Sequence, residues 1–516
     1  MIPTVTPYRS SLPSGHDGFV RVLRAEWTKL RTVRGWVIGL LAVGVVTVLI
    51  GLLGAMGSSN SCDVSACTIP LGPGGEAVTD QFYFVHHPLA GDGSITASAT
   101  SMTGMLPTSG ANMKPGLDAW AKAGIIMKAS TQLGSPYVAI MVTGAHGVRM
   151  QYNYTNDVAG LPGHVSSASP RWLRLTRRGS TITGYDSTDG TQWHLVGTVS
   201  STGLGSTVQA GLFAASPQYT QVTSHFAFSG GATGPTQATA IFDQVSLQGD
   251  QPSGAWHGEE VGGSSGGTPG PSIGYQESRG VFTVSGSGDI APAVSGPAGN
   301  GDTMENFLVG VFAGLLAVVA VGTMFITAEY RHGMIRTTLV ASPRRGRVLL
   351  AKAIVLGMVT FVIGLAASAA VVVIDTELSR ANGSPLIPVP SGTELRIVIG
   401  TAGLLAVSAV LALAIGAVAR RSAGAVTAVV VAIVLPYIIA MSNVLPTPTT
   451  EWLMRVTPAA AFAIQQSLPQ YPQVDNLYVP SLGYYPLSPW AGFTVLCAWA
   501  VLALGVAVIL LRRRDA

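Results

Sequence analysis

The sequence is poor in charged residues. Only 10% of its 516 residues are Asp, Glu, Lys or Arg, whereas soluble globular domains contain about 25%. The mean hydropathy is +0.43. These values exclude an ordinary soluble protein and indicate that much of the chain faces lipid. The formal net charge of +4 does not indicate a nucleic-acid partner, because the Lys and Arg residues stand beside apolar runs and form no single basic stripe.

Cysteine is also scarce, with three residues in the chain. Cys62 and Cys67 follow the first apolar run closely, and Cys497 lies inside the last one. A Cys62–Cys67 disulfide is allowed if that segment lies outside the cytoplasm. Metal binding by this pair is disfavoured, because no His or second Cys pair stands nearby at ligand spacing.

The sequence contains no GxxxxGK[ST] phosphate loop, so it lacks the backbone cradle and the lysine that hold ATP phosphates. Any ATP must therefore bind another polypeptide, and we predict neither a cofactor nor an enzymatic activity for this chain.

Other catalytic or metal-binding arrangements are equally hard to find. A glycosidase needs two carboxylates facing each other roughly 5 to 10 Å apart, and nothing in the sequence pairs Asp186, Asp189 or Asp243. The adjacent His86 and His87 could indicate a metal, but without companions at ligand spacing we interpret them as ordinary exposed residues. We predict no catalytic and no metal-ligating residue.

Long apolar runs are abundant. A membrane-spanning helix needs roughly 20 mainly apolar residues to cross about 30 Å of hydrocarbon. Six runs meet this criterion: 36–56, 307–327, 349–374, 395–418, 423–441 and 490–511. Lys352 and Arg396 are the charged residues inside them, and both stand near helix ends from which their side chains can snorkel. The first run is predicted to be a retained helix and not a signal peptide, because a long leader precedes it and no clear cleavage site ends it.

Basic residues set the orientation of these spans. Lys and Arg cluster before the first run, between the second and third, between the fourth and fifth, and after the sixth. Because cytoplasmic flanks carry the excess of positive charge, we predict a multi-pass protein of the plasma membrane with both termini, 1–35 and 512–516, in the cytoplasm. The segments 57–305 and 442–489 then lie outside, and 328–348 lies inside.

Residues 57–305 are too numerous for a connector and predict a folded domain. Several short runs alternate in polarity and end in turn residues, with Gly179 and Gly190 available for tight turns. These runs are 137–142, 148–154, 171–176, 181–186, 193–199, 209–213 and 241–247. The fold class is therefore an all-α six-helix membrane bundle with an inserted all-β antiparallel sandwich. Residues 251–272 are rich in Gly, Ser and Pro and predict a flexible linker back to the membrane.

The segment 17–34 has the pattern of an interfacial helix. One helical face is apolar and the opposite side is basic, which suits a helix that lies in the plane of the membrane surface. The apolar positions are Phe19, Val22, Leu23, Trp27, Leu30 and Val33. The alternative is an ordinary positive flank that only sets topology.

Two GxxxG matches could bring the first two spans together, namely Gly35 to Gly39 and Gly310 to Gly314. Small residues at this spacing let helix backbones approach closely in membranes. Such matches are also common by chance in Gly-rich helices. The spans lack buried acidic residues of the kind used in proton-coupled transport, which disfavours a secondary transporter.

Two cytoplasmic stretches carry a family resemblance. "LRAEWTKLRT" (23–32) and "AEYRHGMIRTTLVASPRRGRVLLAK" (328–352) resemble the permease subunits of the ABC-2 export family, particularly actinobacterial members. The resemblance implies that the first stretch, with Glu26 and Lys29, is an elbow helix. It implies that the second is the coupling segment that docks on a cytoplasmic ATPase. The residues that it places at or beside that contact are Glu329, Arg331, Gly333, Arg336 and Leu339.

The same resemblance implies cytoplasmic ABC ATPase subunits as partners and a second permease copy, identical or paralogous. It also covers "RVTPAAAF" (455–462), which looks like the family's re-entrant outer segment. The departure is the very long first outer loop, because simpler members join their first two helices briefly. The transported substrate is not indicated by any residue.

The outer domain resembles another group. "WAKAGIIMKAS" (120–130), "RWLRLTRRGSTITGYDSTDGTQWHLVGTV" (171–199) and "VQAGLFAAS" (208–216) look like concanavalin-like jelly-roll domains related to laminin G modules, including the family labelled DUF1349. This resemblance implies glycan binding, and we expect the domain to bind cell-wall glycan, an extracellular partner protein or the exported material. We expect Trp172 and Trp193 in the core, and we expect Asp186 and Asp189 to form turns and not to bind calcium.

Three functional hypotheses follow. The favoured one is the permease of an ABC exporter whose ATP is hydrolysed on a separate subunit. The main rival is a membrane-anchored lectin-like sensor or cell-wall-binding protein without transport, although one span would suffice for display. A third is an extracellular carbohydrate-active enzyme on a membrane anchor.

Overall fold

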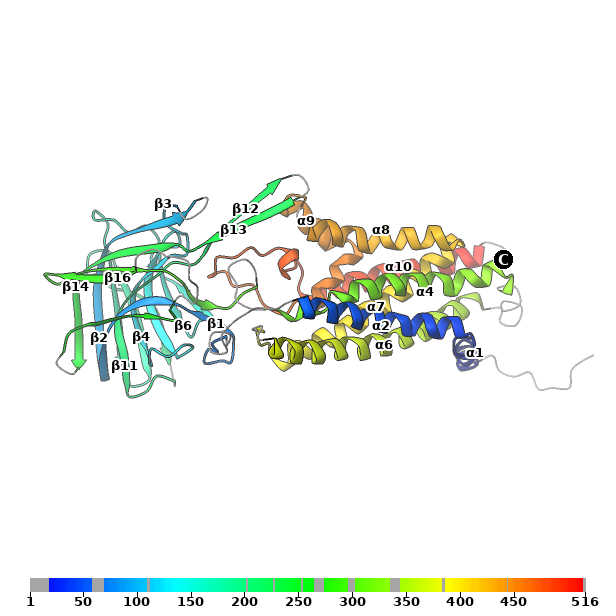
Figure 1. Ribbon diagram of the computed structural model, residues 1–516, viewed down its shortest axis with the longest axis horizontal. Coiled ribbons are helices and arrows are strands. Elements are labelled where there is room, and N and C mark those ends of the chain that lie inside the picture. Colours follow the sequence, from blue (N-terminus) through cyan, green and yellow to red (C-terminus); the bar gives the residue numbers. More distant parts are fainter. Residues whose placement is uncertain are drawn as a thin grey trace, which may run out of the picture.

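The computed structural model is elongated, with a β-domain at one end and a helical bundle at the other (Figure 1). The C-terminal end and helix α1 lie at the end of the bundle farthest from the β-domain (Figure 1). The structure describes residues 18–57, 69–108, 112–200, 203–225, 228–251, 254–263, 273–295, 302–334, 344–382, 386–442 and 444–513. Cys62, Cys67, Arg336 and Leu339 lie outside the described residues.

The helical part contains both long and short helices. They are α1 (Phe19–Thr32), α2 (Arg34–Gly57), α3 (Met304–Phe307), α4 (Gly310–Arg331), α6 (Arg345–Ala381), α7 (Ser391–Ala419), α8 (Ser422–Met441), α9 (Thr447–Val456) and α10 (Pro489–Arg513), with 3-10 helices η1 (Pro458–Gln465) and η2 (Pro480–Leu482). Six of the described helices are long and apolar enough to cross a membrane: α2, α4, α6, α7, α8 and α10. Each coincides with one of the six apolar runs. The protein is therefore a multi-pass membrane protein.

Helix α6 is longer than its apolar run. Its 37 residues extend over roughly 55 Å at 1.5 Å per residue, which exceeds the hydrocarbon thickness of about 30 Å. The apolar run marks only the part that faces lipid or the bundle, so the polar first and last turns of this helix were not predicted.

Helix α7 is the centre of the bundle and packs against α4, α6, α8 and α10. Helices α2 and α4 approach closely at one of the two GxxxG matches: a Cβ added at Gly310 would lie 2.1 Å from the carbonyl oxygen of Thr47. Gly314 faces the same threonine, whereas Gly35 faces open space. The second match therefore brings the helices together, and the first contributes through Gly39, which faces Val321.

Helix α1 packs against α6, and the side that faces the bundle was not predicted from the sequence. Leu30 and the acidic Glu26 are its buried residues. Trp27 and Val33, predicted on the apolar face, are about half exposed. The hydrophobic pattern located the helix, but a polar contact determines which side faces the bundle.

The β-domain is built from antiparallel strands. They are β1 (Val78–Asp80), β2 (Phe82–Pro107), β3 (Met113–Pro115), β4 (Lys122–Lys128), β5 (Tyr137–Thr143), β6 (Val148–Tyr152), β7 (Asn156–Ala159), β8 (Arg171–Arg178), β9 (Thr181–Ser187), β10 (His194–Ser200), β11 (Thr207–Ala215), β12 (Tyr219–His225), β13 (Phe228–Gly234), β14 (Gln237–Asp250), β15 (His257–Val261), β16 (Gly274–Ser278), β17 (Val281–Gly286) and β18 (Ile290–Pro292). The seven runs read from the sequence all fall on strands.

The long strand β2 organises this domain. Its first half lies between β11 and β15, and its second half lies between β8 and β14. The main path of the sheet runs β10-β9-β8-β2-β11-β4-β5-β6-β7. Alternate residues of these strands, such as Leu173 and Leu175 of β8, form the buried core. Strand β2 was not predicted, because Pro88, Gly91 and Gly93 interrupt its pattern.

Two sequence expectations are wrong in this domain. Trp172 and Trp193 are half-buried instead of lying in the core, because the alternation of β8 turns Leu173 and Leu175 inward. The guanidinium of Arg174 stacks over the Trp193 ring at 3.8 Å. The segment 251–272 is not only a linker, because it contains β15, and the chain then returns to the domain through β16, β17 and β18.

The β-domain is docked on one end of the bundle, which we call the outer end, and we call the opposite end, with α1 and the C-terminal end, the inner end (Figure 1). Ala77 and Ala293 at its base share an apolar cluster with Ile387, Leu468 and Tyr484 of the outer loops. Hydrogen bonds cross the same junction: Gln473 Nε2 donates to the Thr155 carbonyl at 3.1 Å, and Asn476 Nδ2 donates to the Ser295 carbonyl at 2.8 Å. The domain therefore contacts the outer loop 442–489 along several of its residues.

Candidate functional site

Four charged side chains meet at the inner end of the bundle and form what we call the inner cluster: Glu26, Lys29, Glu329 and Lys352. Lys352 Nζ lies 2.6 Å from Glu26 Oε2 and 2.6 Å from Glu329 Oε1. Lys29 Nζ lies 3.0 Å from Glu26 Oε1 and 3.4 Å from Glu329 Oε1. One lysine and one glutamate come from α1, and the other two residues come from the end of α4 and the beginning of α6.

The inner cluster is buried at its centre. The side chains of Lys352, Glu26 and Glu329 are 1%, 2% and 9% exposed, whereas that of Lys29 is 41% exposed. The ammonium of Lys352 also lies 4.9 Å from the centre of the Phe325 ring, where a cation is attracted by the ring face. The expectation that Lys352 snorkels is therefore wrong: two carboxylates draw its side chain into the protein.

The carboxylates of the inner cluster act on the pKa of Lys29. Burial alone would lower the pKa of Lys29, but the nearby carboxylates of Glu26 and Glu329 outweigh burial and raise it. A buried ion pair is stable only while both charges are present, because a single unpaired charge in a desolvated site costs about 3–5 kcal/mol. The cluster thus ties α1, α4 and α6 into one unit.

Three of the sequence-predicted residues, Glu26, Lys29 and Glu329, come together in this cluster, and two others do not. Arg331 and Gly333 are exposed just beyond it. Gly333 has φ +68°, the left-handed conformation that commonly ends a helix, and its amide donates to the Tyr330 carbonyl. Lys352 was not assigned to the site. The available signal was a charge inside an apolar helix, which normally has a partner.

Other cationic side chains join neighbouring helices at the same end. The Arg420 guanidinium lies 5.3 Å from the Tyr330 ring and links the end of α7 to the end of α4. Arg345 Nη1 donates to the Leu511 carbonyl at 2.6 Å and links α6 to α10. The inner ends of five helices are therefore connected through polar contacts.

A pocket of about 1410 Å³ opens at the outer end of the bundle, between the helices and the β-domain. Its wall comes from the base of the β-domain, the α6–α7 connection, the start of α7 and the outer loop 442–489. Prolines recur along this wall, and some of them begin its helices, such as Pro480 in η2 and Pro489 in α10. The polar side chains that face the pocket include Glu76, Arg396, Glu451 and Arg455.

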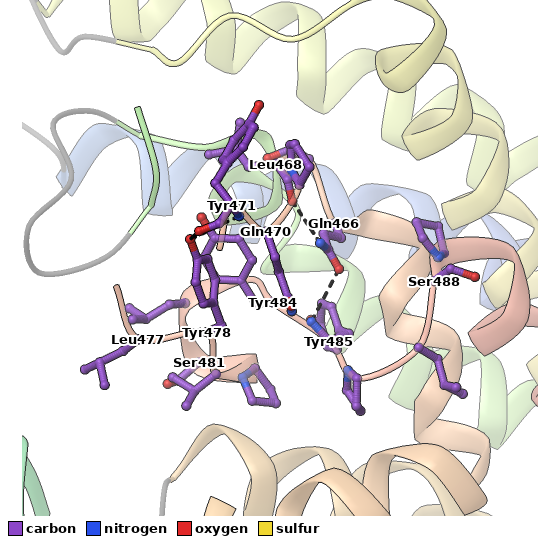
Figure 2. Close-up of a pocket in the computed structure, with 18 of the residues that line it drawn as sticks. Gln466, Leu468, Gln470, Tyr471, Leu477, Tyr478, Ser481, Tyr484, Tyr485 and Ser488 are labelled. Atoms are coloured by element: carbon purple, nitrogen blue, oxygen red, sulfur yellow. Dashed lines mark hydrogen bonds between the residues drawn. The ribbon is translucent and has the colours of Figure 1, made fainter. Parts of the chain in front are cut away.

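Tyrosines form much of the wall shown in Figure 2. Two hydrogen bonds join Tyr471 and Tyr478. The Tyr471 amide donates to the Tyr478 hydroxyl at 3.1 Å, and this hydroxyl donates to the Tyr471 carbonyl at 2.6 Å (Figure 2). Gln466 donates to the Leu468 carbonyl and accepts from the Tyr485 amide (Figure 2). Such a wall offers aromatic faces with a few fixed polar groups, the usual composition of a small-molecule pocket.

An aromatic stack lies in the bundle close to the outer loop. Tyr437 of α8 stacks on Phe462 of η1, with ring centroids 4.0 Å apart, and on Phe312 of α4 at 5.5 Å. Helix η1 is fully buried and packs against α7 and α10. The segment that resembles a re-entrant element thus consists of α9 followed by a buried 3-10 helix, inserted between spanning helices.

The family match begins in β9 and covers the rest of the β-domain together with helices α4 to α10. Residues 181–516, more than half of the chain, match the family described as "ABC-2 family transporter protein". No curated protein matches the chain.

Similarities to solved structures are weak. The GH43 BlXynB protein from Bacillus licheniformis is 16% identical with a TM-score of 0.18, and the match covers 24% of each chain. A functionally unknown protein from Saccharomyces cerevisiae is 15% identical with a TM-score of 0.22, over 36% of this chain and 83% of that one. Scytalido-glutamic peptidase is 10% identical with a TM-score of 0.24, over 40% and 98%. These similarities carry no functional argument. From the family match, and with six candidate spans in its described part, the chain belongs to the ABC-2 family of transporter proteins.

Proposed function

We propose that this chain is the permease of an ABC exporter, in which separate cytoplasmic subunits hydrolyse ATP and the bundle moves a substrate outward. Family membership and the apolar helices support the membrane role. The absence of a phosphate loop from the sequence supports the assignment of ATP hydrolysis to separate subunits. A second copy, or a paralogue, completes the transport path against the exposed apolar faces of the bundle, such as those of α2 and α10.

The inner cluster is the observation that carries this proposal. It ties α1 and the beginning of α6 to the end of α4, and the segment 328–348 connects α4 to α6. A partner that pushes on this segment therefore acts on three helices together, because their charged side chains cannot separate without leaving buried charges unpaired. The rigid unit transmits the closing of the ATPases into the packing of the bundle.

The outer pocket is the exit side of this mechanism. It lies at the end of the bundle opposite the inner cluster, and its wall includes residues that flank η1. The stack of Phe312, Tyr437 and Phe462 closes the bundle beneath it. A movement of α4 at the inner end shifts Phe312 and loosens this stack, which opens the path outward.

The β-domain binds a ligand outside the membrane, and the sequence resemblance implies either a cell-wall glycan or an extracellular protein. Its docking beside the outer pocket supports a role close to the substrate exit. The half-exposed Trp172 and Trp193 provide aromatic surface, to which sugars and proteins both bind. The rival hypothesis, a sensor without transport, leaves the inner cluster and the buried η1 without a purpose, because one helix suffices for display.

Site-specific photocrosslinking in native membranes tests the partner. A photoreactive residue at His332, which is exposed at the end of α4, is expected to capture an ATP-binding cassette subunit. The matched control carries the photoreactive residue at Trp490, which is exposed at the beginning of α10, at the other end of the bundle from His332. It should capture no such subunit. If an ATP-binding cassette subunit is never recovered when the tagged chain is purified, with or without crosslinking, the permease assignment fails and the sensor hypothesis is favoured.

A further inference from the structure

The structure assigns a transition-metal site to the β-domain, formed by His86, His257 and Glu259, and we propose that it binds Zn²⁺ or a divalent ion of similar ligand preference. Among the described residues these three form the group of His, Cys, Asp or Glu side chains placed to hold a metal, with their ligand atoms all within 4.8 Å of one another. The transport proposal does not depend on this site.

The strand register brings the ligands together. His257 of β15 lies directly opposite His86 of β2 in an antiparallel pair, so both side chains project from the same face. Glu259 stands two residues beyond His257 on that face, because side chains of a strand alternate. The sequence places His86 and His257 far apart, and therefore the site appears only once β15 pairs with β2.

The hydrogen bonds of His86 favour a cation. Its Nδ1 lies 2.8 Å from Gln209 Oε1, and its Nε2 lies 2.9 Å from Glu259 Oε1. With the Gln209 amide in this orientation, Nδ1 carries the proton and donates it to the amide oxygen. In neutral His86 the lone pair of Nε2 then faces a carboxylate oxygen. Either a proton or a bound metal ion can lie between two acceptors at this distance, and the third ligand atom, from His257, favours the metal ion.

Gln209 gives the site a feature common in metal proteins. A ligating histidine usually donates its second ring N–H to a carbonyl or carboxylate, which fixes the tautomer and the ring orientation. Phe84 adds to this by stacking on the His86 ring at 4.6 Å between centroids. His86 is 8% exposed, so its imidazole is held in place while His257, on the exposed side, can adjust.

The ligand set selects the metal. Two imidazoles and one carboxylate are the ligands found in open zinc sites, which leave a fourth position for water or another ligand. Hard cations such as Ca²⁺ and Mg²⁺ prefer sites made only of oxygen. Tetrahedral Zn²⁺ with bonds of about 2.0–2.1 Å separates its ligand atoms by about 3.4 Å. The three ligand atoms, which lie within 4.8 Å of one another, are therefore expected to adjust to this separation on binding.

Metal analysis of the purified full-length chain tests the proposal. The protein is prepared in detergent with a tag that contains no histidine, stripped with EDTA, loaded with Zn²⁺ and dialysed. We expect one Zn²⁺ per chain, resistant to excess Mg²⁺, and a concentration-dependent rise in melting temperature. With Co²⁺ in place of Zn²⁺, visible d–d absorption is expected to report the low coordination number.

Variants distinguish this site from general binding. His257→Ala and Glu259→Gln alter the exposed side of the site and are expected to abolish stoichiometric binding. Gln209→Leu should weaken binding by about 10–100-fold, because it removes the orienting partner of His86. His194→Ala is the matched control: His194 also pairs with a carboxylate, Asp186, at 3.1 Å, but no third ligand joins this pair among the residues that the structure describes, so this variant should bind as the wild type does.

Two results would overturn the proposal. One is the absence of stoichiometric Zn²⁺ from the wild-type chain, which would leave His86 and Glu259 as a pair that shares a proton. The other is unchanged binding in both His257→Ala and Glu259→Gln. Circular dichroism of each metal-free variant identifies a substitution that has unfolded the domain. If one of these two variants is unfolded, the other still tests the site.

Discussion

At the residue scale, Lys352 carries the largest expected effect. Its ammonium is shared by Glu26 and Glu329 inside the protein. The substitution Lys352→Met leaves two buried carboxylates with the half-exposed Lys29 as their remaining cation in the cluster, and we expect it to destabilise the bundle by up to about 3–5 kcal/mol. The measurement is the unfolding of the detergent-solubilised chain by heat or denaturant.

A neutral version of the same cluster separates stability from coupling. Replacing a buried ion network by neutral residues of similar volume is often harmless to stability, so the triple variant Glu26→Gln, Glu329→Gln, Lys352→Met should recover most of the loss. If the cluster transmits force, this variant still binds the ATPase but loses transport-coupled hydrolysis. A triple variant as unstable as Lys352→Met would show that the ion pairs themselves hold the bundle together.

At the scale of helices, the contact between α2 and α4 depends on glycine. A side chain at Gly310 would collide with the backbone of α2 at Thr47, and overpacking of this kind costs about 1–3 kcal/mol or more. We expect Gly310→Leu to lower the melting temperature clearly. Gly35→Leu is the control, because nothing lies within 4 Å of its added Cβ. Equal effects of the two substitutions would contradict the assigned packing.

At the scale of the whole molecule, the docking of the β-domain is expected to depend on pH. Burial, followed by the charge of Asp475, raises the pKa of Asp118 to about 7. Burial also raises the pKa of Asp475. Asp118 belongs to the β-domain and Asp475 to the outer loop, so docking brings two carboxyl groups together that share a proton.

The direction of this pH dependence follows from proton linkage. Docking favours protonated Asp118, whose pKa is near 3.8 when free. The docked form is therefore fully favoured at low pH and is weakened as pH rises from about 4 to about 7, by at most about tenfold per pH unit. Spin-label distances between the β-domain and the bundle should show more undocked molecules at pH 8 than at pH 5.

Asp475→Asn tests the origin of this dependence. It removes the neighbouring carboxylate, so the populations should change less with pH. Asp250→Asn, at an exposed position of β14, serves as the control and should behave as the wild type. Populations that do not vary with pH in the wild-type chain would show that this pair does not govern docking.

Some features were readable from the sequence because they depend on local pattern. Apolar runs of sufficient length located all six candidate spans, since backbone polar groups in lipid must pair within the helix. Period-two alternation located seven strands, and positive-φ glycines at Gly179 and Gly190 were anticipated from turn chemistry. Within the site, Glu26, Lys29 and Glu329 were singled out through family resemblance.

The tertiary structure decided what depends on distant pairing. Lys352 lies 326 positions from Glu26, and no local pattern tells whether a helix-end lysine reaches water or two buried carboxylates. His86 and His257 become neighbours only through the register of β2 and β15. Asp118 and Asp475 meet only when one domain docks on another. Local sequence thus determined which segments span and which form strands, because hydrophobic periodicity acts over a few residues. The charged clusters could be identified only from the tertiary structure, because the interacting side chains come from elements that are far apart in the sequence.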